Sequence, residues 1–242
     1  MRIRSKTLIF LTLLLIGLSS CKKSETAAYK CATCATSPTA AAANDNSGKG
    51  IYKGTIAGST GTVLIDIENS SNSISAVIII DGQTINLSST SAYTAGQPYT
   101  GVFTGSYSGQ AASITFVVDA NGGSPTVTAI NIAGHPNATI VVFKELSTSQ
   151  VVCYEGTFGG TSSGVFNMII NTQANTWMTI AKDNNHSTAT LVSGTVSGTS
   201  VSCTSCIGGA GTVSGTISGD NINGSWNDGQ GGSGTWACHK TL

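Results

Sequence analysis

The chain has little charge. Lys and Arg number 11, Asp and Glu number 11, and together they are 9% of the 242 residues, with zero net charge at pH 7. Since a soluble globular domain usually carries about 25% charged residues, hydroxyl groups must cover much of this surface, and 65 residues are Ser or Thr. No arginine follows Arg4. Proteins that bind nucleic acid need a basic surface, so the composition argues against nucleic acid as a partner.

Helical and catalytic patterns are also missing. After residue 21, no stretch has a helical hydrophobic period over three turns, and none is apolar enough to span a bilayer as a helix. The three histidines form neither an H-x-x-x-H nor an HExxH pattern, and no Gly-x-Ser-x-Gly motif stands between a strand and a helix. We therefore predict no catalytic residue, no metal site and no cofactor. The histidines are His135 and His186, expected in solvated turns, and His239, expected to pack on the last strand.

The N-terminus has the pattern of a targeting segment. Residues 7–18 are an apolar run of a length typical of a signal peptide and too short to span a membrane. Three basic residues precede the run: Arg2, Arg4 and Lys6. The run ends in Leu18-Ser19-Ser20-Cys21, which resembles the lipobox of bacterial lipoproteins. The resemblance implies removal of residues 1–20, acylation of Cys21 and a membrane anchor, and Lys22 after the cysteine favours the outer membrane. An ordinary secretory signal is the alternative.

Residues 21–50 contain many small residues and no hydrophobic period, so we predict a lipidated cysteine followed by a flexible tether. Two similar segments follow. The sequence IYKGTI at 51–56 recurs as CYEGTF at 153–158, and TIVVFK at 139–144 matches TWACHK at 235–240. These matches predict tandem copies over 51–146 and 153–242.

Each copy consists of short runs of alternating apolar residues separated by Asp-Gly or Asn-Gly dipeptides, which favour tight hairpin turns. We predict an all-β fold in which each copy is an antiparallel meander of six to eight strands, closed as a small barrel or roll with its first and last strands adjacent. Tyr52, Ile56, Tyr154 and Phe158 should face the core. One β-sandwich formed by both copies is the alternative. The Gly-Thr-x-x-Gly strands and the terminal Gly-Thr-Trp loosely resemble avidins and lipocalins, and that resemblance carries over no binding residue.

Seven cysteines become six once Cys21 is acylated, and an even number in an exported protein suggests three disulfides. We predict Cys153–Cys238, Cys31–Cys34 and Cys203–Cys206. The first pair is expected because Ile51 and Val142 of the first copy both become cysteine in the second. Three alternatives stay open for the two Cys-x-x-Cys units: a zinc site built from all four thiolates, redox chemistry, and disulfides between the two units.

A few other residues are candidates for a site. Trp177, Trp226 and Trp236 all belong to the second copy, where they either fill the core or bind a ligand. Asp66 and Glu68 lie on the outer face of one predicted strand, where a carboxylate pair can bind calcium but more often only meets solvent.

The sequence thus favours a non-catalytic, lipid-anchored protein of the cell envelope that binds a protein or glycan partner or contributes to the envelope structure. The rival hypothesis is a carrier of a small apolar ligand. It predicts a cavity lined by residues such as Phe103, Phe116, Phe166 and Met168. A hydrolase or disulfide-active enzyme is the third hypothesis.

Overall fold

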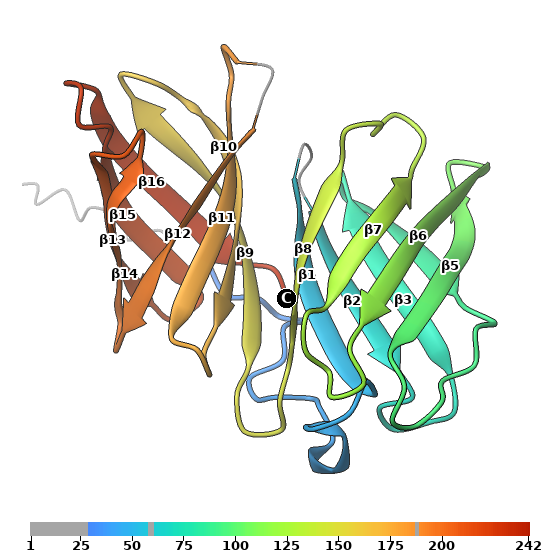
Figure 1. The fold of residues 1–242 in the computed structure, drawn as a ribbon. Coiled ribbons are helices and arrows are strands. Elements are labelled where there is room, and N and C mark those ends of the chain that lie inside the picture. Colours follow the sequence, from blue (N-terminus) through green and yellow to red (C-terminus); the bar gives the residue numbers. More distant parts are fainter. Residues whose placement is uncertain (1–28, 58–60, 187–188) are drawn as a thin grey trace, which may run out of the picture.

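The computed structural model describes residues 29–57, 61–186 and 189–242, which form two eight-stranded β structures side by side (Figure 1). We call them the first barrel (β1–β8) and the second barrel (β9–β16). A single 3-10 turn, η1 (Ala42–Asn44), precedes them. The strands of the first barrel are β1 (Gly50–Ala57), β2 (Gly61–Ile67), β3 (Ile74–Ile80), β4 (Gln83–Ser88), β5 (Tyr99–Tyr107), β6 (Gln110–Val118), β7 (Thr126–Asn131) and β8 (Thr139–Lys144). Those of the second are β9 (Val151–Gly160), β10 (Gly164–Asn171), β11 (Thr176–Asp183), β12 (Ala189–Ser197), β13 (Ser200–Ile207), β14 (Gly211–Ser218), β15 (Asn221–Asn227) and β16 (Ser233–Lys240).

Each barrel is an antiparallel meander in which the last strand returns to pair with the first. In the first barrel β8 pairs with β1, and the hydrogen-bonded sheet ends at β7. In the second barrel β16 pairs with β9, and the sheet closes completely. The prediction of an all-β fold with two tandem barrel-like copies is confirmed. The alternative of one shared sandwich is wrong, because each copy encloses its own hydrophobic core.

The two copies also share one register where their first and last strands meet. Gly54 lies opposite Val142 in the first barrel, and Gly156 lies opposite Cys238 in the second. Cys238 is therefore three residues away from the position opposite Cys153. Because side chains alternate between the two faces of a sheet, an odd offset puts them on opposite faces. The predicted Cys153–Cys238 disulfide is wrong: both cysteines are free and buried, Cys238 in the core of the second barrel and Cys153 on its outer face.

The interior of the first barrel is filled. Branched aliphatic side chains from β1–β6 form most of its core, among them Ile56, Ile65 and Ile78, none of which is exposed. Tyr52 lies in this core as predicted, and its hydroxyl donates a hydrogen bond of 2.8 Å to the Gly48 carbonyl. In the second barrel Tyr154 belongs to the core and Phe158 packs against it, also as predicted.

Residues 29–49, which we call the strap, contact both barrels. On the second barrel the Cys31 amide donates to the Asp220 carboxylate (2.9 Å), and the Lys240 ammonium donates to the Ala35 carbonyl (2.7 Å). On the first barrel the Ala41 amide donates to the Asn69 side chain (2.8 Å). The expectation of a flexible tether over 21–50 is therefore corrected for residues 29–50, and residues 21–28 lie outside the described part of the chain.

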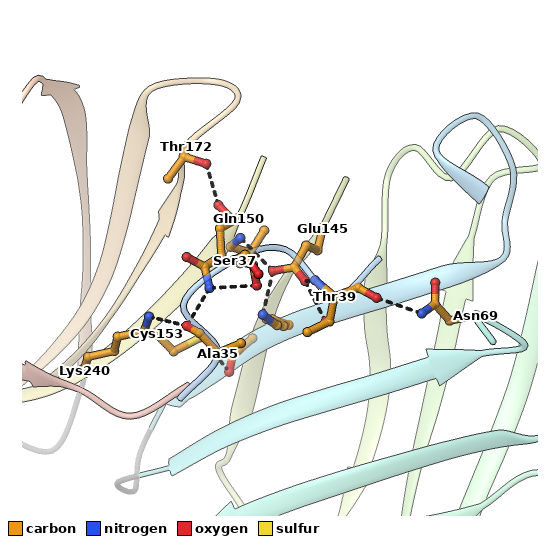
Figure 2. Close-up of polar contacts among 12 residues, drawn as sticks. Ala35, Ser37, Thr39, Asn69, Glu145, Gln150, Cys153, Thr172 and Lys240 are labelled. Carbon is orange, nitrogen blue, oxygen red and sulfur yellow. Dashed lines mark hydrogen bonds and ion pairs between the residues drawn. The ribbon is translucent and has the colours of Figure 1, made fainter. Parts of the chain in front are cut away.

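The buried carboxylate of Glu145 joins the strap to the junction between the barrels (Figure 2). The Lys53 ammonium lies 2.5 Å from the Glu145 carboxylate, and both side chains are almost completely buried. The same carboxylate accepts hydrogen bonds from the Thr39 amide (2.7 Å) and hydroxyl (2.8 Å) and from the Val151 amide (3.1 Å). Since a buried carboxylate is stable only when paired and hydrogen-bonded, Glu145 fixes the strap, β1 and the start of β9 at one point.

The outer faces of the barrels meet in a small apolar cluster. Cys153 and Ile169 of the second barrel are fully buried there, with Val141 and Phe143 of β8 packed beside them. The Asn167 side-chain amide also donates to the Ile56 carbonyl across the junction (2.5 Å). The two barrels are therefore packed together directly as well as through the strap.

Candidate functional site

The second barrel has aromatic side chains inside, and five of them lie directly opposite a glycine on a neighbouring strand. A glycine has no Cβ, so a ring on the adjacent strand can lie flat over its backbone. An added methyl carbon at Gly194, for example, would lie 2.7 Å from the Trp177 indole nitrogen. The pairs are Trp177–Gly194, Trp226–Gly234, Trp236–Gly224, Phe158–Gly164 and Phe166–Gly156.

The three indole N–H groups are hydrogen-bonded to the barrel wall. Trp177 Nε1 donates to the Ser202 carbonyl (3.2 Å), Trp226 Nε1 to that of Gly159 (3.2 Å) and Trp236 Nε1 to that of Ser225 (3.1 Å). Each bond satisfies a polar group that would otherwise be costly to bury. The rings therefore lie along the wall, and the centre of the barrel stays open.

The space left between the rings is a cavity of about 440 Å³. This is within the range of pockets that hold small-molecule ligands. Most of the lining is apolar: Phe158, Phe166, Met168, Trp177, Ala181, Val192, Ile207, Val213, Trp226 and Trp236. The remaining lining residues are Ser162, Thr179, Asp183, His186, Thr190 and Asp228.

The cavity has a closed end and a mouth. Its floor is the packed core, in which Val152, Tyr154, Val201, Ile222 and Cys238 are buried. The strap covers the same end of the barrel, where Cys31 meets Asp220 in the β14–β15 turn. At the other end, polar lining residues come from three hairpin turns: β9–β10, β11–β12 and β15–β16. Ligands would therefore enter at the end away from the strap.

The mouth carries two carboxylates and one imidazole. Asp183 accepts a hydrogen bond from the Ser162 hydroxyl and lies 3.3 Å from Nδ1 of His186. Asp228 accepts hydrogen bonds through one oxygen from the amides of Gln230 (2.7 Å) and Gly232 (2.8 Å). The Ser162–Asp183–His186 arrangement is not that of a serine hydrolase, which needs the histidine between the serine and the aspartate.

The structure brings part of the predicted carrier site together. Phe166 and Met168 line the cavity, and so do the three tryptophans singled out from the sequence. Phe103 and Phe116 do not, because they belong to the filled core of the first barrel. Trp177 and Trp236 are buried, and Trp226 packs against the same core.

Other candidate residues have separate structural roles. His135 faces the Asp81 carboxylate (3.5 Å), and the His239 ring lies 4.4 Å from that of Tyr29. Glu68 pairs with Lys49 (2.6 Å). Asp66 accepts the Asn69 amide (2.8 Å), and burial raises the pKa of its carboxyl. Asp66 and Glu68 are thus held apart by different partners.

The Cys-x-x-Cys units close locally as predicted, giving the disulfides Cys31–Cys34 and Cys203–Cys206. The first lies in the strap, and the second spans an irregularity in β13. The open alternatives that join the two units, by zinc or by disulfides, are therefore wrong. Within the described ranges, no group of three or more His, Cys, Asp or Glu residues is arranged to hold a metal ion.

Sequence reasoning missed most of the cavity wall and the whole mouth. Val192, Val213 and Ala181 are ordinary core-type residues in sequence, and Asp183 and Asp228 stand in turn-like strings. One signal was present: glycines alternate with aromatic or aliphatic residues along β9, β12 and β15, which predicts large rings on the strands beside them.

The chain matches no protein-family model, no curated protein and no solved structure. Among residues 29–57, 61–186 and 189–242, no helix is long and apolar enough to cross a membrane.

Proposed function

We propose that the second barrel binds a small molecule with a flat, apolar body, and that the protein is a non-catalytic carrier or binding protein. The observation that supports this is the apolar cavity of about 440 Å³ with the chain's three tryptophans in its wall. An aromatic wall favours planar ligands, because rings stack best in offset or edge-to-face arrangements.

The contrast between the barrels supports the same proposal. A small barrel is most stable when side chains fill it, as the aliphatic core fills the first barrel. In the second barrel, five glycines hold the rings against the wall and leave the centre open. An unfilled cavity costs stability, so its retention beside a filled copy of the same fold argues for a bound ligand.

The rival hypotheses receive less support. Glycan-binding proteins present tryptophan faces on an open surface, whereas Trp177 and Trp236 are buried inside the barrel. A serine hydrolase needs its nucleophilic serine next to a histidine base, and Ser162 donates to Asp183 instead of to His186. The thiols of Cys153 and Cys238 are free and buried, so a substrate cannot reach them.

We further propose that the protein is extracytoplasmic and anchored through acylated Cys21, in keeping with the lipobox-like sequence, which lies outside the described residues. The two disulfides support an oxidising compartment, because disulfides are rare in reducing ones. The sequence favours the outer membrane.

The test is binding of neutral 1-naphthalenemethanol to the purified protein, followed by calorimetry and by tryptophan fluorescence. All three tryptophans line the cavity, so saturable binding there should change the fluorescence with the same Kd as the heat signal. Ala181→Phe should weaken binding by about tenfold or more, because the new ring occupies the cavity.

Leu191→Phe is the matched control. Leu191 lies on β12, the strand paired with β11, and is 55% exposed on the outer face. It should leave the Kd unchanged. Equal affinity in both variants would contradict the proposed function, and so would failure of the wild-type protein to bind any naphthalene derivative, whether neutral or charged.

A further inference from the structure

The hydrogen-bonding groups of the cavity are unequally divided between donors and acceptors. The three indole N–H groups are already bonded to backbone carbonyls of the wall. The Thr179 hydroxyl donates to the Asn167 carbonyl (2.8 Å), and the Ser162 hydroxyl donates to Asp183. An anionic ligand needs N–H or O–H donors, and the wall has few left to offer.

The charged groups of the cavity favour a cationic ligand over an anionic one. Within the part of the chain that the structure describes, no lysine or arginine lines it, and the aspartates of the lining, Asp183 and Asp228, both lie at the mouth. One oxygen of Asp228 accepts both amide hydrogen bonds of its turn, and no group of the described residues donates a hydrogen bond to the second oxygen. Of the described lining residues, His186 alone has a basic side chain, and it faces Asp183.

The aromatic wall adds to this preference. The face of an indole ring carries negative partial charge and attracts cations, most strongly where water is excluded. Three indoles line this cavity below the two carboxylates. A ligand with a positive end near the mouth would meet attraction from both, whereas a negative end would meet repulsion and no donor.

We infer that the ligand is a cationic amphiphile: a flat apolar body that enters the barrel and a protonated amine that stays at the mouth beside Asp183 and Asp228. This inference rests on the proposed function, because it assumes that the cavity is the binding site. It adds the charge of the ligand and the direction in which it lies.

The experiment compares three ligands with the same ring system: 1-naphthylmethylammonium, neutral 1-naphthalenemethanol and 1-naphthoate. In calorimetry at low ionic strength, the ammonium should bind about tenfold more tightly than the alcohol, and the carboxylate most weakly. Salt should reduce the preference, because the mouth is open to solvent.

Substitutions locate the preference. Asp228→Asn keeps an oxygen to accept the turn amides and removes the charge, so it should lower affinity for the ammonium and leave affinity for the alcohol unchanged. Asp183→Asn should act in the same direction. Asp220→Asn is the control, since it removes the same charge at the strap end of the same barrel, where the carboxylate accepts the Cys31 amide.

The outcomes separate the two proposals. Equal binding of all three ligands, or tighter binding of 1-naphthoate, overturns the inference and leaves the proposed function standing. A preference for the ammonium that survives Asp228→Asn together with Asp183→Asn also overturns it. No binding of any of the three ligands overturns the proposed function.

Discussion

Cys153 and Cys238 show that a shift of one residue in strand register decides which face of the sheet a side chain lies on. Two positions that change from Ile51 and Val142 to cysteine look like partners, and the structure does place both pairs on the adjacent first and last strands. The odd offset nevertheless puts the thiols on opposite faces of the sheet. Burial then raises the pKa of both thiols to about 12.

We therefore expect the thiols of Cys153 and Cys238 to be unreactive in the native protein. At pH 8 a maleimide should label neither until the chain is unfolded, and then label both. Mass spectrometry of the mature, non-reduced protein should show about four hydrogens fewer than the fully reduced chain, from two disulfides. A loss of six hydrogens with no labelling after unfolding would contradict the register described above.

The same thiols give stability a pH dependence. The folded state holds their protons up to about pH 12, whereas an exposed thiol loses its proton near 8.5. Between these values the folded protein binds more protons than the unfolded chain, so these thiols lower the free energy of unfolding as the pH rises. Their contribution to stability is complete below about pH 8 and is lost in alkali.

At the scale of the strand, the pairing of glycine with an aromatic ring makes the cavity possible. Gly194→Ala places a methyl carbon 2.7 Å from the Trp177 indole nitrogen and 2.2 Å from the Ser202 carbonyl oxygen. The indole must then move toward the centre of the barrel. We expect a loss of about 1–3 kcal/mol of stability in urea denaturation, together with weaker binding of 1-naphthalenemethanol.

Gly159→Ala is the control for this prediction. Gly159 lies on β9 with nothing within 4 Å of an added methyl carbon, and its φ lies outside the left-handed region. The substitution should leave stability unchanged or raise it slightly, because alanine restricts the unfolded chain. Equal losses in Gly194→Ala and Gly159→Ala would show that the ring does not depend on the glycine.

The strands and the two copies could be predicted from the sequence, because short local patterns of residues indicate them. Alternating apolar residues and Asp-Gly turns indicated the strands, and the repeated motifs at 51–56 and 153–158 indicated the two copies. The open interior of the second barrel was hard to predict from the sequence, because a core and a cavity wall use the same residue types. Val192 and Met168 line space, whereas Ile56 and Ile65 fill it. The glycines that lie opposite aromatic rings distinguish the second barrel, and those pairs become visible only once the strand pairing is known.

At the scale of the whole molecule, duplication has produced one filled barrel and one hollow barrel. The filled barrel offers a rigid partner surface, against which Cys153 and Ile169 of the hollow one pack. The strap and the buried Lys53–Glu145 pair hold the two together. Figure 2 shows the strap residue Thr39 beside Glu145. Breaking such a pair leaves an unpaired buried charge, so this junction fixes the orientation of the hollow barrel relative to the strap.

That orientation predicts how the cavity faces the membrane. If Cys21 carries the anchor, the eight residues from Cys21 to Tyr29 reach at most about 29 Å, whatever their conformation. The strap begins at the closed end of the hollow barrel, where Asn221 donates to the Tyr29 carbonyl (2.9 Å). We expect the closed end to face the bilayer and the mouth to face away from it, so that ligands exchange with the aqueous side.

Energy transfer to labelled lipid headgroups measures this orientation in vesicles that contain the acylated protein. A fluorophore on Gln173→Cys, in the β10–β11 turn at the strap end, should transfer more efficiently than one on Gln230→Cys, in a turn at the mouth. The native thiols should stay unlabelled because they are buried. Equal transfer from both positions would show that the barrel is free to tumble on its anchor, and stronger transfer from Gln230→Cys would mean that the mouth faces the bilayer and that the ligand comes from the membrane.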